Sequence, residues 1–60
     1  MTKIGRERVR LGLTQEQLGK KSRVDQGEIS RIERGLVTPR VTTLIRINKS
    51  LDYYKNRRAS

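Results

Sequence analysis

Two helix starts, eleven residues apart, constrain the fold of this chain more than any other feature. Thr14 is followed three residues later by Gln17, and Asp25 is followed three residues later by Glu28. This is the spacing of a capping box, in which the first side chain accepts a hydrogen bond from the later backbone and the later side chain accepts one in return. Because the second start follows so soon, the helix between them has about seven residues, 15–21.

Apolar residues flank both starts at the spacing of a hydrophobic staple. Leu13 and Leu18 flank the first start, and Val24 and Ile29 flank the second. A staple fixes the angle at which the chain enters a helix. We therefore expect a tight turn at residues 22–24 and a third helix over 26–34 that stops at Gly35.

The N-terminal segment also has the pattern of a helix. Residues 3–11 carry Ile4 and Leu11 on one face, and Gly12 supplies the left-handed residue that commonly ends a helix. No long stretch alternates between apolar and polar residues, so no sheet is expected. The chain is predicted to be an all-α, compact domain of four to five helices.

A fourth helix, about residues 41–51, is expected after a loop at 36–40 that contains the only proline, Pro39. Its predicted core stripe consists of Val41, Leu44, Ile45 and Leu51, with Asn48 inside the stripe and Ile47 at its edge. Asp52 is expected to cap a last short turn. The tail, 55–60, is expected to be flexible.

The length and the missing residue types exclude several classes of protein. Sixty residues allow one domain, 1–60. The chain has no Cys and no His, which excludes a disulfide framework, a thiolate metal site and the usual general base. There is no Gly-rich phosphate loop and no apolar run long enough to span a membrane. We expect no enzyme activity, no cofactor, no metal and no membrane association.

Charge indicates the kind of partner. Fifteen Lys and Arg against six Asp and Glu give a formal net charge of +9. A small domain this basic usually meets a polyanion, with nucleic acid first and an anionic membrane surface second, although a solvated charged surface is also compatible. The only aromatic residues are the adjacent Tyr53 and Tyr54, which argues against stacking on single-stranded bases.

Two short helices joined by a three-residue turn in a basic chain favour a helix-turn-helix. Gly19 lies on the inner side of the second helix, where a small residue lets the third helix cross nearby. The apolar contacts of the pair are expected from Leu18, Val24, Ile29 and Ile32. The exposed face of the third helix then carries Gln26, Gly27, Ser30 and Arg31. Such a face can enter a major groove about 12 Å wide.

The stretch 12–51 resembles the lambda-repressor and Cro-like helix-turn-helix domain, also called the Xre family. The matching motifs are Gly12-Leu13-Thr14-Gln15, Leu18-Gly19, Ile29-Ser30-Arg31-Ile32-Glu33-Arg34-Gly35, Pro39 and Thr43-Leu44. The resemblance implies a lambda-repressor-like fold whose third helix lies in the major groove, with its N-terminal residues reading bases.

The resemblance also implies which residues read bases: Gln26, Gly27, Ser30 and Arg31. Gln binds adenine, and Arg binds guanine, in bidentate fashion. Gly27 has no side chain, so a base contact that many relatives make there is absent. Glu28 could accept from cytosine, although capping is the simpler role.

Phosphate contacts are implied for Thr14, Gln15, Arg23, Arg34 and Arg40. Gln15 opens the second helix, where unpaired backbone N–H groups at the positive end of the helix dipole suit a phosphate. It is also expected to brace Gln26, unless it is merely an exposed first-turn residue. Arg34 and Arg40 bracket the loop after the third helix, and the resemblance implies that this loop holds the DNA backbone. The alternative is a basic loop that is only solvated. Arg23 stands where the family prefers Gly, which implies either a further phosphate contact or a different turn.

Scaffold roles are implied for three residues. Arg8 and Glu33 match a family ion pair between the first and third helices, and Gly19 allows the close helix crossing. Glu7 stands at a position that is often apolar in the family, and this difference affects the packing of the first helix.

These features predict a sequence-specific transcriptional regulator of bacterial or phage type, most simply a Cro-like repressor, located in the cytoplasm on the nucleoid. It is expected to bind double-stranded DNA as a homodimer on a two-fold operator, without a small-molecule ligand. The alternative is a DNA-binding antitoxin or accessory subunit of a protein complex. A third alternative is a nonspecific binder of polyanions or membrane surfaces, which would need one long basic amphipathic face that the expected short, capped helices do not provide. Four residues are candidates for the dimer contact, although a role in the core of the monomer would explain them equally well: Ile47, Leu51, Tyr53 and Tyr54.

Overall fold

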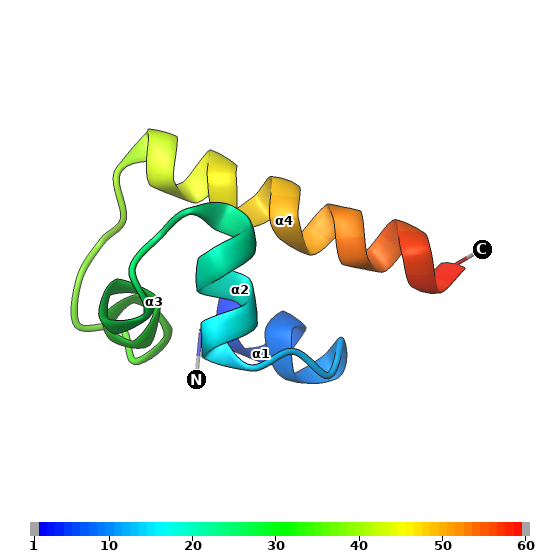
Figure 1. Cartoon of the computed structure of the whole chain (residues 1–60). Helices are drawn as coiled ribbons and strands as arrows, with labels where there is room; N and C mark the ends of the chain where they lie inside the picture. Colours follow the sequence, from blue (N-terminus) through cyan, green and yellow to red (C-terminus); the bar gives the residue numbers. More distant parts are fainter. Residues whose placement is uncertain (1, 60) are drawn as a thin grey trace.

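The computed structural model describes residues 2–59, with side chains through residue 57, and contains four helices. They are α1 (Lys3–Arg10), α2 (Gln15–Ser22), α3 (Gln26–Glu33) and α4 (Val41–Ala59). The described residues contain no strand, so the all-α prediction is confirmed in its four-helix form. Helix α2 lies at the centre and contacts α3 and α4, while α1 contacts α3 (Figure 1).

The start of α2 confirms the first predicted capping box. The Thr14 hydroxyl accepts from the Gln17 backbone N–H at 3.0 Å, and the Gln17 side-chain oxygen accepts from the Thr14 N–H at 2.8 Å. Because both bonds are local, this helix start depends on little outside the segment itself.

The start of α3 has the predicted cap but not the predicted box. Asp25 accepts from the Gly27 backbone N–H at 2.9 Å. The Glu28 carboxylate instead accepts from the Arg31 guanidinium at 3.0 Å. A charged donor one turn along the helix competes with the neutral N–H of Asp25, and the ion pair forms in its place.

The predicted ends of α1 and α3 are correct within one residue. Helix α1 ends at Arg10 and α3 at Glu33. Gly12 and Gly35, which follow these ends, both have φ near +74°. This left-handed conformation stops a helix at little cost only where the residue lacks a Cβ.

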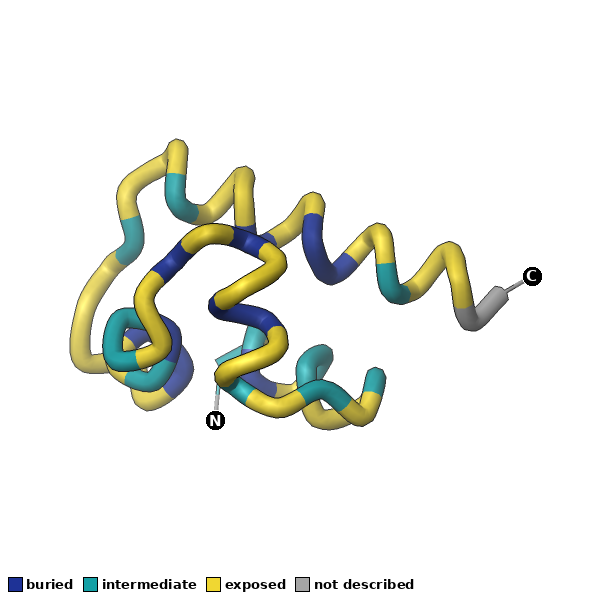
Figure 2. Tube along the Cα trace, in the orientation of Figure 1, coloured by how far each residue is buried: buried dark blue, intermediate teal, exposed yellow. Residues whose placement is uncertain are grey.

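The core lies where α2, α3 and α4 meet (Figure 2). Its buried side chains are Leu18, Val24, Ile29, Ile32, Ile47 and Leu51. Ile4, Leu11 and Leu13 pack against its edge and are partly buried. The four apolar contacts expected for the helix-turn-helix are therefore all in the core.

The predicted division of the last helix is wrong. Helix α4 continues from Val41 to Ala59, so there is no fifth helix and no separate turn at Asp52. Residues 41–59 contain neither Gly nor Pro, so nothing in this segment forces the helix to end at Leu51. The tail expected to be flexible belongs to α4 as far as Ala59, and Ser60 lies outside the described residues.

The predicted core stripe of α4 is correct at Leu51 but wrong at Val41, Leu44 and Ile45, because the helix has a different orientation. Ile47 and Leu51 are fully buried, whereas Val41 is 72% exposed and Ile45 is 48% exposed. Asn48 is exposed and needs no buried partner. The helix is turned so that Ile47 rather than Ile45 meets the core.

None of the helices in the described part of the chain combines the length and the hydropathy that crossing a lipid bilayer requires.

Candidate nucleic-acid interface

Helices α2 and α3 are joined by a turn that contains one strained residue. Arg23 has φ 59° and ψ 38°, in the left-handed region, and its N–H bonds to the Gly19 carbonyl. A non-glycine residue in this conformation costs about 1–2 kcal/mol. The turn therefore has the left-handed geometry for which the resembled family prefers glycine, and Arg23 adopts it despite its Cβ.

Gly19 allows the close approach that was expected at this position. A Cβ built there would lie 2.8 Å from the Val24 carbonyl oxygen and 3.6 Å from the backbone nitrogen of Gln26. The contact is therefore with the turn and the first residue of α3. Since both neighbours are backbone atoms, they cannot move aside as a flexible side chain could.

The ion pair expected between Arg8 and Glu33 is present and links several elements. Arg8 donates to the two Glu33 carboxylate oxygens at 2.6 and 3.0 Å. A third guanidinium nitrogen donates to the Leu13 carbonyl at 2.7 Å, in the segment before α2. Glu33 is only 4% exposed. The pair therefore fixes α1 and the entry to α2 against the end of α3.

Gln15 has a different partner from the one expected. Its side-chain nitrogen donates to the Glu33 carboxylate at 3.2 Å, and Gln26 is exposed. The predicted brace between the two glutamines is absent from the structure. Gln15 is also not merely an exposed first-turn residue, because it is partly buried. The buried, charged acceptor holds the amide more strongly than a neutral, solvated amide would.

The four residues expected to read bases lie together on the outer face of α3. Gln26 and Arg31 are exposed, and Gly27 and Ser30 are partly buried. A Cβ on Gly27 would lie 2.9 Å from a carboxylate oxygen of Asp25, the cap of α3, and at ordinary contact distance, 3.5 Å, from a guanidinium nitrogen of Arg31. The missing side chain at Gly27 therefore leaves room for the Asp25 carboxylate that caps α3, while Glu28 holds Arg31 beside the first turn.

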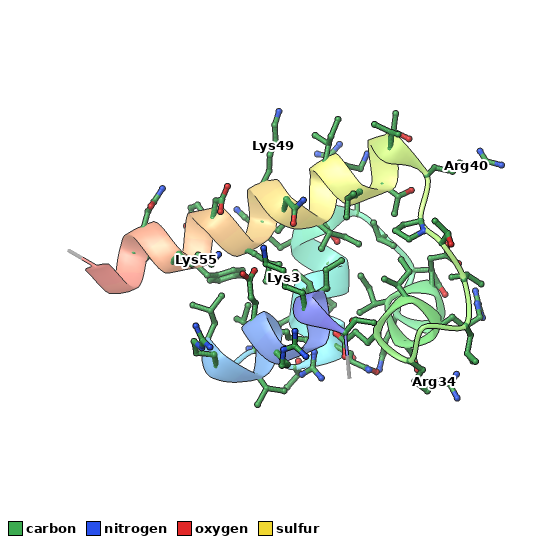
Figure 3. The ribbon with its side chains drawn as sticks, turned by 180° about the vertical axis from the view of Figure 1, so that it is seen from behind. Lys3, Arg34, Arg40, Lys49 and Lys55 are labelled. Carbon is green, nitrogen blue, oxygen red and sulfur yellow. The ribbon has the colours of Figure 1, made fainter. Side chains whose placement is uncertain are left out.

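The residues expected to contact phosphates border this face on two sides. At the start of α2, the Thr14 hydroxyl is used by the helix cap, and Gln15 is held by Glu33. On the other side, Arg34 and Arg40 are exposed. Figure 3 shows both arginines extending away from the body of the chain, on the side of the loop between α3 and α4.

One cation beside this face, Arg46, was not expected from the sequence. A surface groove between the turn, α3 and α4 is lined by Arg23, Arg31, Arg40 and Arg46, together with Val24, Asp25, Glu28, Thr38 and Thr43. Arg46 belongs to the middle of α4 and directly precedes the buried Ile47. The period of α4 could have identified it, because a stripe centred on Ile47 and Leu51 places Arg46 at the border of the core.

One of three comparisons with known proteins agrees with this helix-turn-helix geometry. A protein-family model described as helix-turn-helix matches residues 4–55, which is most of the chain. No curated protein and no solved structure matches the chain significantly.

Proposed function

This chain belongs to the Cro/C1-type helix-turn-helix family, the Xre family, whose members are DNA-binding regulators, and we propose that it is a sequence-specific transcriptional repressor. In this proposal α3 enters the major groove of double-stranded DNA, and the bound protein occludes a promoter. The site of action is then the nucleoid, in the cytoplasm.

The observation that carries the proposal is the outer face of α3. Gln26 begins the helix with an exposed amide, and Arg31 lies one turn further along with its guanidinium held near the helix start by Glu28. An amide suits the N6 and N7 of adenine, and a guanidinium suits the O6 and N7 of guanine. Both groups therefore offer planar hydrogen bonding on the exposed face of α3.

The flanking residues supply the contacts that fix the register of the protein on the duplex. The proposed phosphate contacts are Thr14, Gln15, Arg23, Arg34 and Arg40. At the start of α2 the backbone N–H groups and the positive end of the helix dipole favour a phosphate. Such contacts position the protein without distinguishing sequences, and the residues of α3 provide the sequence preference.

We propose that the protein binds a two-fold operator as a homodimer, because one α3 helix covers one half-site. Half-sites in this arrangement lie about 34 Å apart, which is one helical turn. Two of the four candidates for the dimer contact, Ile47 and Leu51, are fully buried in the core. They are unavailable to a partner, which leaves Tyr53 and Tyr54.

Selection of bound sequences from random duplexes, repeated at two salt concentrations, tests this function. A palindromic sequence is expected, with half-site spacing near one helical turn. If no sequence is enriched at either salt concentration, a sequence-specific repressor is excluded. Enrichment of an unpaired half-site would support base reading by α3 but contradict the dimer.

A further inference from the structure

Four cations form a second charged surface that the base-reading face does not include. Lys21, Arg23, Arg46 and Lys49 line a shallow groove between the end of α2 and the middle of α4. We call these four residues the α4 basic surface. The other residues that line the groove are Ser22 and Ser50, so no carboxylate borders it.

The two serines explain why the cations converge. Ser22 and Ser50 are 3% and 5% exposed. Their hydroxyls donate to carbonyls of their own helices, at 2.7 Å for Ser22 to Leu18 and 2.9 Å for Ser50 to Arg46. Small, internally bonded side chains let α2 and α4 approach closely. Long cationic side chains from both helices are therefore brought to one groove.

Among the described residues, no ion pair neutralises a cation of this surface. Their four ion pairs are Arg8–Glu33, Lys20–Glu16, Arg31–Glu28 and Lys55–Glu7, and none includes a residue of the α4 basic surface. The Lys21 ammonium lies 3.8 Å from the centre of the Tyr53 ring. An aromatic ring attracts this cation without neutralising it. The surface therefore offers a polyanion a net positive potential, and the carboxylates of Asp25 and Glu28 line the neighbouring groove at α3 instead.

The α4 basic surface is continuous with the base-reading face. Arg23 and Arg46 belong to it and also line the groove that contains Arg31 and Arg40. The cations thus form one track from α3, across the turn, to Lys49 on α4. Figure 3 shows the exposed Lys49 side chain directed away from the rest of the chain.

We propose that the α4 basic surface binds the phosphate backbone of the duplex beyond the base pairs that α3 contacts. The inference rests on the proposed function, because α3 must first bring the duplex to this side of the molecule. Binding here adds phosphate contacts and releases the counterions that those phosphates hold. It increases affinity for any duplex long enough to reach α4.

The salt dependence of binding tests the proposal. The probe is a random-sequence duplex of roughly three helical turns, and the variants are Arg46→Ala and Lys49→Ala. Lys3→Ala is the matched control, because it removes the same charge from the groove between α1 and α4. Each test variant should reduce the slope of log K against log[salt] by about one unit, so its affinity falls about 3.5-fold less than that of the wild type between 50 and 200 mM salt. Lys3→Ala should retain the wild-type slope.

Duplex length separates this inference from the proposed function. The selected operator is compared with the same operator extended by about half a helical turn at each end. The extension should increase the affinity of the wild type and of Lys3→Ala, but not that of the Arg46→Ala/Lys49→Ala double variant. If the double variant gains as much as the wild type, and the single variants keep the wild-type slope, the inference is overturned and the proposed function stands. If the wild type itself selects no sequence, the proposed function fails.

Thermal melting shows whether the variants remain folded. A further variant, Lys49→Glu, reverses the charge at this position and tests the phosphate contact independently. Arg46 and Lys49 are exposed, so their truncation should leave the melting temperature unchanged. Charge reversal at Lys49 should weaken binding to the extended duplex more than Lys49→Ala does. Equal binding by the two folded variants contradicts a phosphate contact at this position.

Discussion

At the scale of single residues, the outer face of α3 depends on how two carboxylates near its start are used. Gly27 leaves room for the Asp25 carboxylate that caps the helix, and Glu28 holds the Arg31 guanidinium at 3.0 Å. An exposed pair of this kind contributes little to stability, about 0.2–0.5 kcal/mol. Its main effect is to restrict the positions of a guanidinium that is proposed to meet a base edge.

The first prediction concerns base reading by Arg31. Arg31→Ala should weaken binding to the selected operator by about 1–3 kcal/mol and relax the preference at one base pair, because a bidentate contact with guanine is lost. Competition binding with operators that vary at each position measures both effects. Equal losses of affinity on operator and random DNA would assign Arg31 to the phosphate backbone instead.

The second prediction concerns the strained turn residue. Arg23→Gly should not lower the free energy of unfolding, because removing about 1–2 kcal/mol of left-handed strain offsets the roughly 0.5–1 kcal/mol of extra backbone entropy that glycine loses on folding. The same change should weaken binding to all duplexes alike, since a cation is removed from the interface. Thermal melting and binding at several salt concentrations measure the two effects. A less stable variant with unchanged DNA affinity would refute this account.

At the scale of elements, the geometry of the helix-turn-helix depends on a close approach between the backbone of α2 and the backbone of the turn and of the first residue of α3. Gly19 lies against the Val24 carbonyl and the first residue of α3, so there is no room for a side chain at residue 19. The angle between α2 and α3 therefore depends on this glycine, together with the buried Leu18 and Ile29.

The third prediction tests that crossing. Gly19→Leu should destabilise the fold by about 1–3 kcal/mol, because the new side chain forces backbone atoms apart. Chemical denaturation gives the loss, and Lys20→Leu, at the neighbouring exposed position, is the control. Full stability of Gly19→Leu would mean that α2 and α3 do not approach as closely as described.

At the scale of the whole molecule, one buried carboxylate connects three parts of the fold. Glu33, near the end of α3, accepts from Arg8 of α1 and from Gln15 at the start of α2. A domain of this size has only about 5–15 kcal/mol of stability, so a single buried charge network matters for the entire fold. The same network sets the relative position of the two helix starts that border the proposed DNA face.

The fourth prediction follows from this network. Glu33→Ala should cost about 3–5 kcal/mol, because it leaves the Arg8 charge partly buried without its partner. Glu16→Ala removes a carboxylate from an exposed pair whose side chains are 81% and 66% accessible, and should cost less than about 1 kcal/mol. Thermal melting compares the two variants. Similar melting temperatures would show that the buried pair does not hold the helices together.

Much of the fold could be predicted because its determinants are local. The capping box of Thr14 and Gln17, and the helix ends at Gly12 and Gly35, depend on residues within one or two turns of each other. The exposed face of α3 followed from the apolar residues on its opposite side. These preferences act on any chain with the same short segment, whatever surrounds it.

The sequence by itself thus determined the short helices, their caps and the outward face of α3, since hydrogen bonds and backbone preferences over a few residues are enough to specify them. Tertiary structure decided which face of α4 meets the core, whether Gln15 turns toward Gln26 or Glu33, and that Lys21 and Lys49 share a groove. In each of these cases several arrangements satisfy the local rules almost equally well. Only contacts between residues distant in the chain, above all the burial of Ile47 and Leu51 and the charge of Glu33, select one of them.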